Sequence, residues 1–434
     1  MKTLKLAIAA LVVASSAYAQ DAEQPVEKKN EFQVDVQLRA RAEYRNGAIQ
    51  PGEKGDPPAF FINERARLGL GYLRKNLELR VGVQHVGVWG QDPQVPKAGR
   101  VMLHEAWGQL TTNNGKLFAR IGRQQLAYDG DRILGTLDWN VAGRWHDAVK
   151  LGYQDGKHFL HLIVAYNANS ERITGPNYYE QGSAMLYKTM QAAWYHFTAP
   201  KHPFNASFTF LNIGYETGTP EKSRTDYLQT LGTKLDYGKP ALNVSLEAYY
   251  QFGHKIHDVR TNAYMFAING QYKPINPLGF TLGFDYLSGD SNLDDKNTAF
   301  DPLYGTHHKF YGFMDYFYAS LWNQWGLMNP HFTIDYSPSS RVALQGTYHY
   351  FLTAADPTDS FVNEGKEKIS KGLGSEVDLQ FTYKIFKDVT LQVGYSMMFG
   401  TKTMDLLKGG DHTAWQDWGW IQLNINPRIF NAKW

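Results

Sequence analysis

The sequence predicts an all-β protein, a transmembrane antiparallel up-and-down β-barrel of about 18 strands with short periplasmic turns and long extracellular loops. Three observations carry this prediction: a tight polar turn at every second connection, segments in which apolar and polar residues alternate, and a secretory leader. Because such barrels have an even strand number, the short turns imply about nine outward hairpins. The eight turns are Arg74-Lys75-Asn76, Thr112 to Gly115, Gln154 to Lys157, Ala199 to Pro203, Gly238-Lys239-Pro240, Pro274 to Pro277, Ser337 to Ser340 and Phe386-Lys387-Asp388.

The N-terminus predicts export from the cytoplasm. Lys2 and Lys5 precede an apolar run over residues 6–14, and Ala17-Tyr18-Ala19 forms a small-residue cleavage site before Gln20. We therefore expect a signal peptide over residues 1–19, a flexible periplasmic leader over 20–31 and one barrel over 32–434. The predicted location is the bacterial outer membrane.

Composition excludes several classes of protein. The chain has no cysteine, so it has neither disulfides nor thiolate metal sites. Beyond the signal, no stretch approaches the roughly 18 apolar residues of a membrane helix. Removal of Lys2 and Lys5 takes the formal net charge from +2 to zero, so bulk charge indicates no partner and nucleic acid is not expected. An aromatic content of 14% fits the two aromatic girdles of a membrane barrel.

The first predicted strand, residues 32–44, shows the two faces most clearly. Phe32, Val34, Val36 and Leu38 are in one phase, and charged residues such as Arg39 are in the other. A period of two puts the apolar set towards lipid and the charged set towards the lumen. A large soluble β-sandwich would give the same alternation, and the hairpin order favours the membrane barrel. The chain ends on an aromatic residue, Trp434, which resembles the signal that the barrel-insertion machinery reads.

Cations fall in the inward phase of the first three strands. Arg39 and Arg41 lie on the first strand, Arg65 and Arg67 on the second and Arg80 on the third. Adjacent strands lie about 4.8 Å apart, so these residues could form a ladder that attracts planar carboxylate or phosphate groups. The alternative is a structural network in which nearby carboxylates neutralise the arginines.

The segment 122–140 is too charged to face lipid, and Leu126, Ile133 and Leu134 make it too apolar for a freely solvated loop. We expect it to fold inward and narrow the lumen. The alternative is a loop that packs against the rim and holds two strands through salt bridges. The expected constriction charges are Arg123, Asp129, Asp131, Arg132, Asp138 and Arg144.

At this point the chain resembles the alginate-export-type outer-membrane porins. The resemblance lies in RARLGL at 65–70, LHEAW at 103–107, GRQ at 122–124, YDGDR at 128–132, LDW at 137–139 and FDPLYGTHHKFYGFMDYF at 300–317. It implies a barrel of about eighteen strands with an Arg-rich lumen through which an acidic polysaccharide leaves the cell. By position, the resemblance implies polymer-facing cations at Arg65, Arg67, Arg123, Arg132 and Arg144, with counter-charges at Asp129, Asp131 and Asp138.

The expected function is passive passage of anionic oligo- or polysaccharides through an outer-membrane channel, without a cofactor. The expected partners are these saccharides, outer-membrane lipid, the barrel-insertion machinery and a periplasmic export complex. Two alternatives stay open: a general diffusion porin with weak selectivity, and a surface adhesin that conducts nothing. An enzyme is not predicted, because no Gly-x-Ser-x-Gly turn presents a nucleophile.

No metal site is predicted. Asp290, Asn292 and Asp294 offer alternate oxygen ligands that make a weak calcium candidate. The loop lacks the downstream bidentate glutamate of a high-affinity calcium loop, so a solvated acidic loop is the favoured interpretation.

Overall fold

The computed structural model describes residues 30–92, 100–180, 187–291, 296–320, 322, 324–357 and 369–434. The predicted signal peptide and nearly all of the predicted leader lie outside these residues. The strands are β1 (Glu31–Asn46), β2 (Ala59–Arg74), β3 (Leu77–Val88), β4 (Met102–Thr111), β5 (Leu117–Gln124), β6 (His146–Gln154), β7 (His158–Tyr166), β8 (Thr189–Thr198), β9 (Phe204–Glu216), β10 (Thr225–Lys239), β11 (Leu242–Ile256), β12 (Val259–Ile275), β13 (Leu278–Leu287), β14 (Lys296–Asn297), β15 (Leu327–Ser339), β16 (Val342–Leu352), β17 (Gly372–Phe386), β18 (Val389–Gly400), β19 (Gln416–Ile425) and β20 (Arg428–Lys433). The helical segments are η1 (Asp129–Asp131), η2 (His307–Lys309) and α1 (Lys402–Lys408).

The strands close into an antiparallel barrel of 18 strands, which confirms the predicted fold. Closure occurs where β1 pairs with β19, as in the pair Ala40 and Leu423. Two further strands do not add to the wall. β14 is a two-residue strand parallel to β12, and β20 continues β19 beyond Pro427 and pairs with the start of β1. Among the described residues, no helix is both long and apolar enough to cross a membrane.

The side chains of β1 have the two predicted faces. Leu38 and Tyr44 on the outward face are 49% and 37% exposed, whereas Arg41 and Glu43 on the inward face are 5% and 0% exposed. Successive side chains of a strand point to opposite faces, so one set meets lipid and the other fills the barrel. β1 begins at Glu31, one residue before the predicted start.

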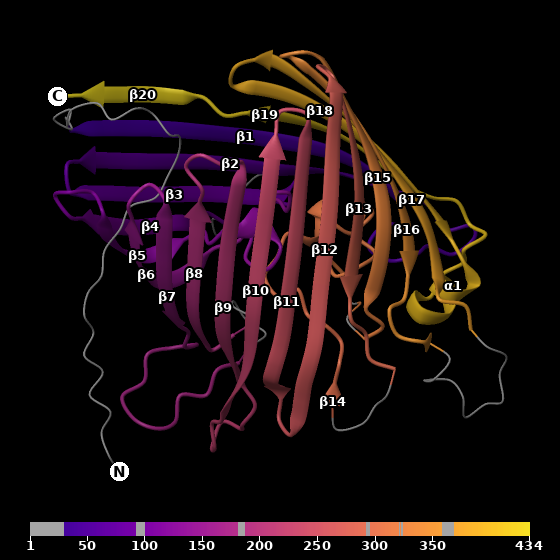
Figure 1. Ribbon diagram of the computed structural model, residues 1–434, viewed down its shortest axis with the longest axis horizontal. Helices are drawn as coiled ribbons and strands as arrows, with labels where there is room; N and C mark the ends of the chain where they lie inside the picture. Colours follow the sequence, from indigo (N-terminus) through magenta and orange to yellow (C-terminus); the bar gives the residue numbers. More distant parts are fainter. Residues whose placement is uncertain are drawn as a thin grey trace.

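The eight predicted tight turns join strands at one end of the barrel. Figure 1 shows the turns after β10 and β12 at one end of the wall and β14 and α1 towards the other. One connection at the long-loop end differs from the prediction: β11 and β12 are joined by only His257 and Asp258. Asp258 has a φ of 62°, and aspartate tolerates this left-handed conformation better than most residues, so a tight hairpin forms here too.

Candidate functional site in the barrel lumen

Two connections from the long-loop end fold into the barrel. We call residues 125–145, between β5 and β6, the first inward segment, and residues 298–320, between β14 and β15, the second inward segment. Both bury large apolar side chains: Leu126 is 1% exposed, and Phe300 and Tyr311 are 0% and 1% exposed. The two segments pair with each other through a parallel β-bridge between Leu134 and Tyr304.

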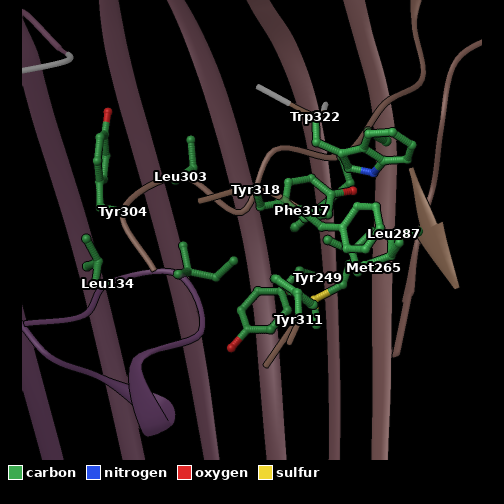
Figure 2. Close-up of a cluster of buried hydrophobic side chains, with 14 of the residues drawn as sticks. Leu134, Tyr249, Met265, Leu287, Leu303, Tyr304, Tyr311, Phe317, Tyr318 and Trp322 are labelled. Atoms are coloured by element: carbon green, nitrogen blue, oxygen red, sulfur yellow. The ribbon is translucent and has the colours of Figure 1, made fainter. Parts of the chain in front are cut away.

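The inward segments pack on a part of the lumen wall that is apolar. Figure 2 shows Tyr311 of the second inward segment near Tyr249 of β11 and Met265 of β12, with Leu287 of β13 next to Met265. These strand residues are at most 4% exposed, and they belong to one continuous cluster. The sequence carries a signal for this wall. Several strands from β8 to β13 are apolar in both phases, and a strand that is buried on both faces loses its polar alternation.

The first inward segment is tied to the β8–β13 side of the wall by Asp129. Its carboxylate accepts hydrogen bonds from the Trp194 indole at 3.0 Å, from the Ser207 hydroxyl at 2.6 Å and from the Thr209 hydroxyl at 3.0 Å. A carboxylate with three donors is well satisfied without a cation. Asp129 therefore anchors the first inward segment to β8 and β9.

Arg132 forms the second tie on this side of the barrel. Its side chain is 1% exposed, and its guanidinium lies 3.3 Å from a carboxylate oxygen of Glu247 and 3.1 Å from one of Asp285. The guanidinium also stacks over the Phe310 ring at 3.7 Å, which joins the two inward segments. The expected constriction cation is thus enclosed in a buried ion triad.

The opposite side of the first inward segment is held by arginines of β1 and β2. Arg65 donates to the carbonyls of Val141 at 2.7 Å and Asn140 at 2.8 Å, and to the Asp138 carboxylate at 2.6 Å. Arg39 donates to the Asp138 carbonyl at 2.7 Å, and Arg41 donates to a carbonyl of the same stretch. The exposed fractions of the three arginines are 1% to 7%.

These contacts correct one expectation from the sequence. Arg39, Arg41, Arg65 and Arg132 are not open cations of the lumen. Groups of the first inward segment accept hydrogen bonds from the first three, and Glu247 and Asp285 of the wall enclose Arg132. Their role in this structure is to hold the first inward segment at two sides of the lumen. No sequence pattern indicates which backbone carbonyl will accept a hydrogen bond from an arginine side chain, so these contacts were not predictable.

Three of the remaining expected site residues also make contacts inside the barrel. Arg67 donates to the Gln84 amide oxygen at 2.8 Å and stays half-buried. The Asp131 carboxylate lies 3.6 Å from the Lys309 amine, and its carbonyl accepts from the Thr306 N–H at 2.8 Å. Arg144 donates to the carbonyls of Tyr304 and Gly305. Burial lowers the pKa of Arg144 to about 10, so it remains protonated at neutral pH.

Arg123 lies on the outward face of the wall, which is a second correction. It is two residues from Ile121, a side chain that is 64% exposed on the outward face, and side chains two apart in a strand share a face. Its guanidinium pairs with the Asp147 carboxylate of β6, and both nitrogen-to-oxygen distances are 2.9 Å. Asp147 is opposite Arg123 in the strand register and has the same outward phase.

We therefore expect Arg123→Gln to leave ion selectivity unchanged. The substitution removes a cation that faces away from the lumen, so the field inside the barrel is nearly the same. The measurement is the reversal potential across a planar bilayer under a salt gradient. A shift as large as the one that a lumen-facing charge reversal produces would show that Arg123 lines the pore after all.

The second inward segment is held by two buried carboxylates of β17. Glu376 and Asp378 are 0% and 2% exposed and accept backbone N–H groups, at 2.8 Å from Met314 and 3.2 Å from Phe313. Gly312 has a φ of 85°, and a Cβ there would lie 2.6 Å from the Glu376 carboxylate. Only glycine fits this close approach, so the carboxylates fix the segment through its backbone.

Replacing both carboxylates with alanine should loosen the second inward segment. Two buried N–H groups would lose their acceptors, at about 1–3 kcal/mol each. The amide pair Glu376→Gln and Asp378→Asn is the matched control, because it keeps an acceptor at each position and removes the like charges. We expect the alanine pair to be cleaved faster by protease within residues 298–320. Equal cleavage of the two double variants would contradict the assigned contacts.

The structure does not strengthen the calcium candidate. Asp290 uses a carboxylate oxygen to accept the Thr298 N–H at 3.2 Å, and Asn292 and Asp294 lie outside the described residues. Among the described residues, one group has ligand atoms within 4.8 Å of one another, formed by Asp405, Asp411 and His412. His412 already pairs with Asp405, and we assign no metal to this loop.

A closed barrel with lipid-facing apolar side chains and inward-folded segments is an outer-membrane channel. The chain belongs to the alginate export family, whose model matches residues 30–404. A search of curated proteins gave no match.

Several solved outer-membrane proteins share the fold. OccAB1 of Acinetobacter baumannii matches with a TM-score of 0.63 at 12% identity, over 92% of this chain and 97% of that one. A BenF-like porin from Pseudomonas fluorescens Pf-5 matches with a TM-score of 0.62 at 11% identity, over 92% and 99%. OccK2 (OpdF) of Pseudomonas aeruginosa, in complex with glucuronate, matches with a TM-score of 0.59 at 10% identity, over 92% and 98%.

Proposed function

We propose that this channel passes anionic saccharides, either small sugar acids or an acidic exopolysaccharide, by passive diffusion. The observation that carries the proposal is the separation of charge around the lumen. Inward-facing cations concentrate on β1 to β6, where Asp35 and Glu43 pair with some of them, and further buried carboxylates lie on β11, β13 and β17. The cations are Arg39, Arg41, Arg65, Arg67, Arg80, Arg120 and Lys150, and the carboxylates are Glu247, Asp285, Glu376 and Asp378.

Part of the cationic wall is accessible to a solute. Arg80 is 27% exposed although it pairs with Asp35 at 2.7 Å. Arg67 and Arg120 are half-buried, and the Arg120 guanidinium lies 3.7 Å from the centre of the Trp107 ring. Guanidinium groups of this kind lower the cost of bringing an anion into the lumen, and weak repeated contacts allow it to leave.

Two similarities support this substrate class. The family to which the chain belongs is described as alginate export, and alginate is a polymer of sugar acids. OccK2, which has the same fold, was solved with glucuronate, a single sugar acid.

The second candidate function is a general diffusion porin with weak selectivity. Its support is the ion pairing along the cationic wall, where Asp35 pairs with Arg80 and Glu43 pairs with Arg41 and Arg45. Pairs of this kind reduce the net field that a passing ion meets.

Uptake into liposomes separates the two functions. We expect liposomes that contain the full-length barrel to take up glucuronate faster than glucose, a neutral sugar of similar size. Equal rates would favour the general porin. The absence of uptake for both solutes would contradict each channel function.

A further inference from the structure

A cavity of about 530 Å³ lies inside the barrel beside the second inward segment. One side of it is lined by His308, Lys309, Phe310, Gly312 and Phe313. The facing side belongs to strands β9 to β13, β15 and β16, and most of its side chains are uncharged amides and hydroxyls. Six of them are Asn243, Asn269, Gln271, Thr281, Thr333 and Gln345. Such groups both donate and accept hydrogen bonds, as the hydroxyls of a sugar do.

The charges other than Lys309 that line this cavity have partners of opposite charge. Arg132 and Asp285 form part of the buried triad, and both are 1% exposed. Asp236 is 39% exposed and lies 3.5 Å from the Lys234 amine, which partly compensates its charge. These groups have little capacity left for a passing anion.

Lys309 differs from these groups. It ends η2 at the edge of the same cavity, and its side chain is 52% exposed. Its amine donates one hydrogen bond, to the Gly130 carbonyl at 2.8 Å, and the closest carboxylate oxygen, of Asp131, is 3.6 Å away. An ammonium group has three donors, so one remains for a solute when Gly130 and Asp131 are both counted as partners. The contact with Gly130 also fixes where the amine lies.

We propose that Lys309 is the specificity-determining cation of the channel and binds the carboxylate of a sugar acid in this cavity. The amides and hydroxyls of the facing strands bind the hydroxyl groups of the same solute. The inference rests on the proposed function and narrows its substrate class. A cavity of about 530 Å³ holds a solute of one or two sugar units, since small-molecule sites range over about 300–1,000 Å³. The preferred solute is therefore a short sugar acid.

The test uses the full-length barrel in a planar bilayer, with glucuronate or glucose added to one side. We expect glucuronate to interrupt the current of the wild type, and Lys309→Glu to weaken this block about tenfold through loss of a charge-assisted contact. Lys309→Arg should keep most of the block, and glucose should block neither protein strongly. The matched control is Lys157→Glu in the exposed turn between β6 and β7, which should behave as the wild type.

The outcomes separate this inference from the function on which it rests. A wild type that prefers anions and is blocked by glucuronate, together with an unchanged Lys309→Glu variant, would overturn the role of Lys309 and leave the proposed function standing. A wild type with neither anion preference nor glucuronate block would overturn the proposed function itself, and the inference with it. Equal block of the wild type by glucose and glucuronate would overturn the assignment of a carboxylate site.

Discussion

Arg132→Met is expected to destabilise the barrel by about 3–5 kcal/mol, because it removes the cation from a buried ion triad. Glu247 and Asp285 would remain enclosed with no positive partner, and Arg132 itself is only 1% exposed. The first inward segment would also lose its tie to β11 and β13. The measurements are the free energy of unfolding in urea and the noise of the single-channel current, which should increase.

The control for this prediction is the triple variant Arg132→Met, Glu247→Gln and Asp285→Asn. It removes all three charges together, so no buried charge is left unpaired, and most of the lost stability should return. A single Arg132→Met variant as stable as the wild type would show that water reaches the two carboxylates and that the triad is not closed.

Arg65→Ala is expected to have the second largest effect. Arg65 is buried and supplies donors to Val141, Asn140 and Asp138, which form the part of the first inward segment that lies against β1 and β2. Without them, the Val141 carbonyl would lose its donor, at up to about 1–3 kcal/mol, and Asn140 and Asp138 would be held by Arg39 alone. We expect the segment to move, which would appear as multiple conductance levels in single-channel recordings.

Arg65→Lys provides the matched comparison. Lysine keeps the charge but lacks the planar fork that reaches several acceptors at once, so its recordings should lie between those of the wild type and the alanine variant. If Arg65→Ala gives the single steady level of the wild type, then Arg39 and Arg41 alone hold the segment and the assigned role of Arg65 fails.

The barrel was predictable because its turns and strands depend on residues that are neighbours in the sequence. Tight turns need particular residues, such as the pair Lys387-Asp388, and a strand between lipid and lumen needs a period of two. Both features can be read from neighbouring residues alone. The phase of Arg123 could also have been found from the sequence, because Leu117, Ala119 and Ile121 are apolar in the same phase.

The interior was less predictable because its contacts join distant parts of the chain. Asp129 meets Trp194, and Arg132 meets Glu247, only after the first inward segment has folded across the lumen. Sequence could identify a charged and partly apolar segment, but it could not tell an anchoring arginine from an exposed one. For the same reason Lys309 did not stand out, since its exposure depends on how η2 packs.

The decisive measurement for an anion channel is the reversal potential of the full-length barrel in a planar bilayer under a gradient of potassium chloride. We expect stable current steps with a reversal potential displaced towards the equilibrium potential of chloride, because inward-facing cations concentrate on one wall. A reversal potential on the potassium side, or a bilayer that stays sealed after insertion, would contradict this expectation.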